Sequence, residues 1–431
     1  MSLSNKSRPE ERIKTLQPFI KYKNGKLFIE DISYFDLIEK YGTPLFVFSK
    51  NRIKENIRHF SKTFGKQYDK IKYFYPYRAN YLPNILDIII TEGWGAEVNS
   101  SFEYKLAKSL HSAQIILNGF NRKLYTEIIN DRHILYIAVD SLEDAKYLNE
   151  IGEVQNKSIN IGLRVHPDLG LSQKYSIVPR GFKLGYDIKN NDAEEIVLSL
   201  SKMRKINMIA INSHIAIRQT IPDLYVEALR SMIKFADKLY KKTGINIKYI
   251  NIGGGFESRN LLEQMTTLDC FAIKFSECLS NARKEYTLIL EPGRFIISDT
   301  SIVLTEVLSK KINTGHKWLI VDVGINTLIP LKSASFDVIP TKVSTAYDFF
   351  NVGDYISSSM GIIKENIYLP QKTNIGDILA IVNTGAYTLS MSEQFSLLRP
   401  NVVLVDEKDV KVIKTVEDVR ETIERLKHQK W

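Results

Sequence analysis

Short apolar segments rich in β-branched residues alternate with longer amphipathic segments between residues 71 and 291. Apolar β-branched runs are typical of buried strands, and apolar positions three or four residues apart are typical of helices. The pattern predicts strands at residues 71–75, 95–98, 114–117, 135–139, 160–165, 208–214, 248–252 and 288–291. Most segments between them are predicted helices, for example 82–91, 101–109 and 222–243. Eight strands alternating with helices favour a parallel (β/α)8 barrel, although strand counting alone leaves an open doubly wound sheet as the alternative.

The pattern changes after Arg294. Residues 301–308, 318–322, 377–382 and 401–405 are predicted strands joined by turns, and residues 416–427 are a predicted amphipathic helix. We therefore predict an α/β barrel at 49–297, followed at 298–431 by a β-domain, a barrel or sandwich, with a terminal helix. Residues 1–48, which include an apolar strand at 44–48, are predicted to pack with the C-terminal β-domain.

Composition narrows the class of protein. The 431 residues are 44% hydrophobic and 25% charged, as in soluble globular proteins, and no apolar run is long enough to span a membrane. The N-terminus lacks the apolar centre of a signal peptide, so we expect a cytoplasmic protein without a membrane partner. The only cysteines, Cys270 and Cys278, fall in one predicted helix, which predicts a reducing compartment and no metal site.

The formal charge of +10 raises the question of nucleic-acid binding. The lysines are spread along helical segments, for example at 234–242, and they form no basic tail. A solvated basic surface explains this distribution better than a nucleic-acid partner does. A site that attracts acidic substrates is the functional interpretation of the same charge.

Candidate chemistry lies where the predicted barrel strands end. Active-site groups of such barrels gather at the C-terminal ends of the strands, and a phosphate commonly sits between the loops after strands seven and eight. Strand seven leads into Gly253-Gly254-Gly255, and strand eight leads into Glu291-Pro292-Gly293-Arg294. Strand six ends at His214, and strand one leads to Arg78-Ala79-Asn80. Each motif alone is more often a turn or a structural residue, but their joint placement predicts an anion-binding active site.

In this order and spacing the motifs resemble those of the diaminopimelate, ornithine and arginine decarboxylases, which are pyridoxal-phosphate enzymes of the alanine-racemase-like fold. The matching segments cover nearly the whole chain and are Thr43-Pro44-Leu45-Phe46-Val47, Tyr77-Arg78-Ala79-Asn80, Gly95-Ala96-Glu97-Val98, Asn212-Ser213-His214-Ile215, Ile252-Gly253-Gly254-Gly255-Phe256, Glu291-Pro292-Gly293-Arg294, Val321-Asp322-Val323-Gly324 and Gly385-Ala386-Tyr387. The resemblance implies a carboxy-lyase with pyridoxal 5'-phosphate as coenzyme and a small amino-acid-derived substrate. It also implies a homodimer with active sites at the subunit interface.

The resemblance further implies a role for each matching residue. Glu291 would pair with the protonated pyridine nitrogen, which keeps the ring an electron sink, His214 would stack on the ring, and Glu97 would support the site near the coenzyme link. The coenzyme phosphate would be held by Gly253, Gly254, Gly255, Gly293, Arg294 and Tyr387. The substrate would be bound by Arg294, Asp337, Ser357 and Tyr387, with Asp337 meeting a distal amine.

One departure concerns the catalytic position itself. Where the family has the lysine that forms a Schiff base with the coenzyme, this chain has Arg78. A guanidinium, with a pKa above about 12, stays protonated and is not nucleophilic. This predicts an inactive or trapped protein without covalent coenzyme. The arginine is either an introduced substitution or the mark of a natural pseudoenzyme or a diverged activity. Such a pseudoenzyme would be a noncatalytic binding or regulatory protein that heterodimerises with an active decarboxylase.

A second departure concerns specificity. Ile356 and Ser357 stand where the family usually has a cysteine and an acid, and Arg218 and Lys332 add positive charge. These changes favour a substrate whose far end is neutral or acidic, as in the citryl-ornithine decarboxylases of siderophore biosynthesis. Alternatively, the two basic residues face solvent. An amino-acid racemase is disfavoured, because racemases lack the Glu291-Pro292-Gly293-Arg294 motif.

Overall fold

The computed structural model describes residues 7–119, 122–176, 178–179, 181–329 and 334–427, and its contacts divide the chain into two compact units. The barrel unit comprises Asn56–Glu257 and Leu262–Phe295. The β unit comprises Met1–Glu55, Ser258–Leu261 and Ile296–Trp431. Within the described ranges, no helix has the length and apolar character that crossing a membrane requires.

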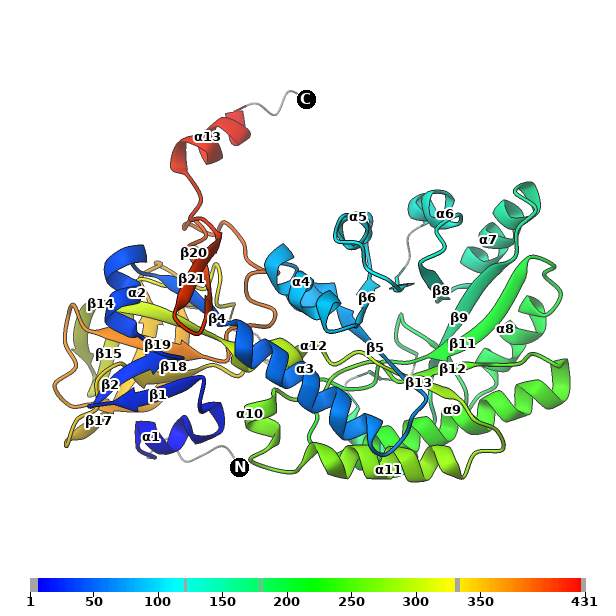
Figure 1. The fold of residues 1–431 in the computed structure, drawn as a ribbon, viewed down its shortest axis with the longest axis horizontal. Helices are drawn as coiled ribbons and strands as arrows, with labels where there is room; N and C mark the ends of the chain where they lie inside the picture. The colour runs from blue at the N-terminus through cyan, green and yellow to red at the C-terminus, as the bar shows by residue number, and fades with distance from the viewer. Residues whose placement is uncertain (1–6, 120–121, 177, 180, 330–333, 428–431) are drawn as a thin grey trace. The chain divides into compact units, whose positions relative to one another are not determined.

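The barrel unit is built on a closed ring of parallel strands (Figure 1). Within the described residues the ring has eight strands, namely β5 (Ile71–Pro76), β6 (Gly95–Val98), β7 (Ile115–Leu117), β8 (Ile134–Val139), β9 (Ile159–His166), β11 (Ile206–Asn212), β12 (Tyr249–Asn251) and β13 (Thr287–Leu290). Each strand pairs with the next, and β13 pairs back with β5. This closure confirms the predicted barrel and excludes the open sheet. A short strand, β10 (Tyr186–Asp187), is not part of this ring and pairs parallel with the last two residues of β9.

Large side chains fill the inside of the barrel because glycines on neighbouring strands leave room for them. A Cβ atom on Gly162 of β9 would lie 2.7 Å from the ring of Tyr136, and one on Gly95 of β6 would lie 2.5 Å from the ring of Phe74. Both aromatic rings are fully buried. Close packing of this kind makes the inside of the barrel a core and not a pore.

Helices follow the strands, as the pattern predicted. They are α3 (Lys50–Gly65), α4 (Pro83–Thr91), α5 (Ser101–Ser109), α6 (Arg122–Ile128), α7 (Leu142–Val154), α8 (Asp192–Leu200), α9 (Pro222–Thr243), α10 (Arg259–Leu262), α11 (Leu268–Ser280) and α12 (Gly293–Ile297). Ser100, Ser141 and Thr267 accept hydrogen bonds from backbone N–H groups in the first turns of α5, α7 and α11. A cluster of buried aromatic rings attaches α3, α9 and α11 to the barrel and consists of Phe60, Phe64, Tyr225, Phe256, Phe271 and Phe275.

The β unit is organised around one long strand, β14 (Ser301–Asn313). It pairs antiparallel with β4 (Leu45–Ser49), β15 (His316–Val321) and β19 (Ile378–Val382), and β4 pairs in turn with β20 (Asn401–Asp406). The remaining strands are β1 (Ile20–Lys23), β2 (Lys26–Ile29), β3 (Ile32–Ser33), β16 (Asp337–Pro340), β17 (Tyr347–Asp354), β18 (Ile362–Pro370) and β21 (Asp409–Lys414). N-terminal side chains such as Leu27 and Val47 share one core with C-terminal ones such as Leu304 and Val403.

Most element boundaries lie within two residues of the predicted ones. Strand six ends at Asn212, two residues early, and His214 beyond it lies against Gly253, where an added Cβ would meet its Nδ1 at 2.8 Å. Strand β14 continues beyond residue 308 to Asn313, where its outer half is exposed and no longer apolar. The last helix, α13 (Val419–Lys427), begins three residues late, and the N–H of Val416 before it donates to the side chain of Asn401.

Candidate active site

Polar side chains interrupt the apolar barrel strands at their carboxyl ends. In a parallel barrel these ends meet at one rim, so residues distant in sequence become neighbours. The residues concerned, which are buried or partly buried, are Glu97 of β6, Asn118 after β7, Arg164 of β9, Asn212 of β11, Asn251 of β12 and Glu291 after β13. A buried polar group needs a partner, and the contacts among them define the site.

Arg78 forms an ion pair with Glu97. Arg78 lies in the 3-10 turn Tyr77–Ala79 after β5, and its guanidinium contacts one carboxylate oxygen of Glu97 on the neighbouring strand. The other oxygen accepts a hydrogen bond from Asn118 Nδ2 at 2.7 Å. The Glu97 side chain is fully buried, whereas 37% of the Arg78 side chain is exposed. Arg78 therefore supplies the counter-charge that a buried carboxylate requires.

Glu291 lies in a hydrogen-bond network centred on Asn251. Asn251 Nδ2 donates to Glu291 Oε1 at 2.7 Å and to the hydroxyl of Tyr136 at 2.8 Å. Its Oδ1 accepts from the N–H of Gly253 at 2.8 Å, so one amide orients both the acid and the glycine loop. Burial, and then the charge of Glu97, raise the pKa of Glu291 to about 7. The carboxyl group can therefore hold or lose a proton near neutral pH.

His214 carries a neutral ring. Burial lowers its pKa to about 3, and the positive charges of Arg78 and Arg164 act in the same direction. The N–H of Gly254 donates to its Nδ1 at 3.4 Å. The imidazole is thus uncharged at physiological pH and fixed against the glycine loop.

The glycine loop packs backbone against backbone. Gly253 and Gly255 have φ angles of 71° and 90°, which favour glycine. A Cβ atom on Gly254 would lie 2.0 Å from the carbonyl oxygen of Glu291, and one on Gly293 would lie 3.0 Å from the Cβ of Ala79. Arg294 is buried at the start of α12. The barrel unit therefore brings together the residues that the sequence placed at four separate strand ends.

The other predicted site residues lie in the β unit. Tyr387 has a φ angle of 59°, an uncommon value for an aromatic residue, and Ser357 is exposed in the turn after β17. Asp337 accepts hydrogen bonds from Arg12 Nε at 3.0 Å and from Arg12 Nη2 at 2.6 Å. This bidentate pair gives Asp337 a structural partner, and its contact with a substrate amine stays a prediction. Lys332 lies outside the described residues.

Several residues of the network were missed by the sequence analysis. Asn118, Asn251 and Tyr136 orient the two acids, and Arg164 lies 3.7 Å from Asp140 at the same end of the barrel. The available signal was a polar residue near the end of an apolar strand, as in Tyr249-Ile250-Asn251. That signal alone gives no partner, because the partner belongs to a neighbouring strand.

Comparison with known families assigns the chain to a class. Residues 50–298 match the family described as pyridoxal-dependent decarboxylase, pyridoxal binding domain, and residues 294–385 match the C-terminal sheet domain of pyridoxal-dependent decarboxylases. The chain therefore belongs to the pyridoxal-dependent decarboxylases, which are carboxy-lyases that use pyridoxal 5'-phosphate. The predicted family, enzyme class and coenzyme are confirmed.

Similar proteins span almost the full chain. The diaminopimelate decarboxylase of Aquifex aeolicus is 29% identical over 428 residues, which cover 95% of this chain and 97% of that protein. The diaminopimelate decarboxylase of Methanocaldococcus jannaschii is 28% identical over 425 residues, 94% of this chain and 95% of the other. A crystal structure of the M. jannaschii enzyme superposes with a TM-score of 0.88 at 25% identity, covering 95% of this chain and 98% of that one.

The barrel residues fit the coenzyme in all but one respect. The buried acid Glu291 and the neutral imidazole of His214 fit the coenzyme ring with its basic nitrogen. The glycine loop at 253–255 fits the coenzyme phosphate. Arg78 does not fit the aldehyde group of the coenzyme, because a guanidinium that stays protonated cannot form a Schiff base with it. The site fits noncovalent binding of the coenzyme and does not fit a covalent link at position 78.

Glu291 should make the stability of the coenzyme-free protein fall as the pH rises from about 4.5 to about 7. Because burial raises the pKa of Glu291, the folded state holds this proton more tightly than the unfolded chain, and deprotonation favours unfolding. At pH 8 the shift corresponds to about 3 kcal/mol. Glu291→Gln should therefore be more stable than the unsubstituted chain at pH 8, with a smaller difference at pH 4, in urea denaturation. Glu150→Gln, an exposed acid on α7, is the control, and a difference in stability that does not vary with pH would contradict the expectation.

Proposed function

We propose that this chain carries the coenzyme and substrate site of an L-amino-acid decarboxylase but, with arginine at position 78, is arrested before turnover. The observation that carries the proposal is the Arg78–Glu97 ion pair. Glu97 is fully buried, so its charge holds the guanidinium at the place where the family needs a nucleophilic amine. Asn118 donates to Glu97, and Asn251 donates to Glu291 and accepts from Gly253, at the same end of the barrel.

In this proposal each remaining residue keeps a defined task. Gly253, Gly254 and Gly255, together with Gly293 and Arg294, hold the phosphate. Glu291 pairs with the ring nitrogen, and Asn251 keeps its carboxyl group oriented. The neutral His214 lies against the ring without opposing its positive charge. When bound, the coenzyme supplies the electron sink for the carbanion left by loss of CO2.

For the substrate we propose an L-amino acid of the ornithine and diaminopimelate class, or a side-chain conjugate such as citryl-ornithine. The diaminopimelate decarboxylases among the relatives support the first, and Ile356 with Ser357 supports the second. Arg218 gives the conjugate less support than the sequence suggested, because its Nε donates to Glu257 at 2.7 Å. Its charge is thus balanced within the protein.

A noncatalytic regulatory protein is the second candidate, and the same Arg78–Glu97 pair favours it. It would associate with a lysine-bearing relative, whereas the decarboxylase proposal implies a homodimer. The β unit supports association of either kind, since exposed Met360 and Phe395 line a groove of about 600 Å³ with Ile325 and Ile329. Light scattering of the chain alone, and of the chain mixed with such a relative, separates the two candidates. The decarboxylase proposal implies a homodimer of the chain alone, and the regulatory proposal implies a complex with the relative.

Noncovalent coenzyme binding tests the proposed function. Equilibrium dialysis should show one pyridoxal phosphate per chain, and the protein should lose all of it after denaturation and gel filtration. Gly254→Ala should weaken binding by at least about tenfold, because a Cβ atom there would meet the carbonyl of Glu291 at 2.0 Å. Gly65→Ala is the control, since a Cβ at that position meets nothing within 4 Å. A folded unsubstituted chain that binds no coenzyme would refute the proposal.

A further inference from the structure

The loop after β11 lies directly on the glycine loop. The N–H of Gln219 donates to the carbonyl of Gly255 at 2.8 Å, and the N–H of Glu257 donates to the carbonyl of Gln219 at 3.2 Å. A Cβ atom on Gly255 would lie 2.1 Å from the carbonyl oxygen of Ala216. Residues 216–219 and 253–257 therefore form one packed element, in which movement of either loop displaces the other.

This element contains a charged pair. Arg218 Nε donates to Glu257 Oε2 at 2.7 Å. The side chain of Glu257 is 5% exposed and that of Arg218 is 33% exposed, so the acid is the buried partner. Arg218 has a φ angle of 53°, which side chains rarely adopt, and the backbone contacts of Gln219 hold the loop there.

A buried carboxylate beside a phosphate site is unfavourable unless its charge is cancelled. Glu257 follows the last glycine of the loop by two residues, and phosphate carries close to two negative charges. Like charges on neighbouring groups repel more strongly where water is excluded than in bulk solvent. The carboxylate can therefore be tolerated there when the cation on the neighbouring loop stays paired with it.

We propose that Arg218 is a positioning residue of the coenzyme phosphate site in this chain. It neutralises Glu257 and thereby lets the glycine loop accept a doubly charged phosphate. The inference rests on the proposed function, which assigns the phosphate to Gly253, Gly254 and Gly255. It adds a residue whose effect depends on the phosphate alone and not on the ring.

The test compares two ligands that differ only in the phosphate. Affinities for pyridoxal phosphate and for pyridoxal are measured by fluorescence titration of the full chain, Arg218→Gln, Glu257→Gln and the double variant. Arg218→Gln should lower the affinity for pyridoxal phosphate by at least about tenfold and change the affinity for pyridoxal by less than about twofold. Glu257→Gln should bind pyridoxal phosphate at least as well as the unsubstituted chain. The double variant should recover most of the affinity that Arg218→Gln loses.

Controls separate a charge effect from a folding effect. Arg218→Lys keeps the charge and should keep most of the affinity for pyridoxal phosphate. Arg230→Gln breaks an exposed ion pair with Glu227 on α9 and should change the affinity for neither ligand. Equal losses for both ligands in Arg218→Gln, or a double variant no better than Arg218→Gln, would overturn the inference and leave the proposed function standing. Failure of the unsubstituted chain to bind pyridoxal phosphate would overturn both.

Discussion

Replacing Arg78 with lysine should raise CO2 release from an L-amino acid by at least about 1000-fold over the unsubstituted chain, which corresponds to about 4 kcal/mol of barrier. A lysine amine can lose its proton in a desolvated site and then act as a nucleophile, whereas a guanidinium cannot. Glu97, which pairs with Arg78 in the present chain and accepts a hydrogen bond from Asn118, remains available to orient the amine.

The assay offers ornithine, diaminopimelate and citryl-ornithine to each form of the protein, with coenzyme present. Arg78→Met serves as the control, because it removes the guanidinium without adding an amine. If the methionine form released as much CO2 as the lysine form, loss of the arginine and not gain of a nucleophile would be responsible. Absence of release from all three substrates by the lysine form would count against the decarboxylase proposal.

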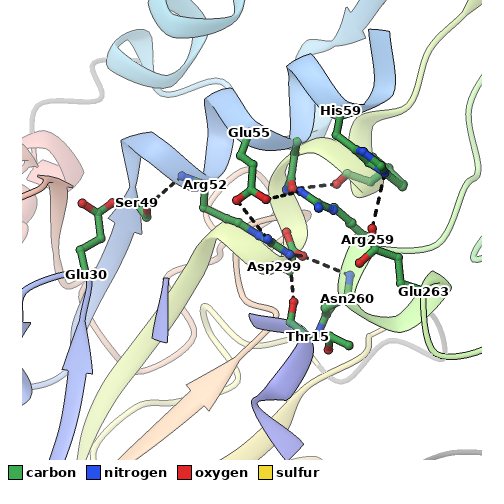
Figure 2. Close-up of polar contacts among 12 residues, drawn as sticks. Thr15, Glu30, Ser49, Arg52, Glu55, His59, Arg259, Asn260, Glu263 and Asp299 are labelled. Atoms are coloured by element: carbon green, nitrogen blue, oxygen red, sulfur yellow. Dashed lines mark hydrogen bonds and ion pairs between the residues drawn. The ribbon is translucent and has the colours of Figure 1, made fainter. Parts of the chain in front are cut away.

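The second large effect concerns stability of the β unit. Arg52 Nη2 donates to Asp299 Oδ2 at 2.8 Å, and the same oxygen accepts from the N–H of Asn260 at 3.1 Å (Figure 2). The Arg52 side chain is 2% exposed and the Asp299 side chain is fully buried. Asp299→Ala leaves a buried guanidinium without its main counter-charge, so it should lower the free energy of unfolding by about 3–5 kcal/mol.

Glu55 provides a matched comparison on the same arginine. It contacts Arg52 Nη1 at 3.2 Å and Arg259 Nη1 at 2.8 Å, but its side chain is 44% exposed (Figure 2). Water can replace both contacts, and Glu55→Ala should therefore cost about 1 kcal/mol or less in urea denaturation. Equal losses for the two substitutions would show that burial does not set the strength of the pair.

Local patterns predicted most of the barrel and part of the β unit. The barrel strands are short, buried and β-branched, so each is visible without its neighbours. Strands β17 and β18 were missed, because the buried end of β17 includes Asn351, Gly353 and Asp354, and exposed and buried positions follow one another irregularly along β18. The position of β4 between β14 and β20 depends on pairing with residues more than 250 positions away, which no local pattern contains.

The candidate site shows the same limit. The glycine loop, Glu291 and His214 could be found, since each lies where a predicted strand ends. The partners could not: Arg78 meets Glu97 only because β5 and β6 are adjacent, and Asp337 meets Arg12 across 325 residues. Sequence motifs thus predicted the enzyme class and the coenzyme. Long-range packing decides which charged side chains are paired with one another.

Borohydride reduction followed by intact mass measurement tests the central claim most directly. The reagent converts a lysine–coenzyme link into a stable amine that survives denaturation. After incubation with one equivalent of pyridoxal phosphate, the chain with Arg78 should carry only scattered, substoichiometric label on its lysines, and Arg78→Lys should gain one coenzyme, mapped to residue 78. A stoichiometric label on the unsubstituted chain, or no label on the lysine form, would contradict the account.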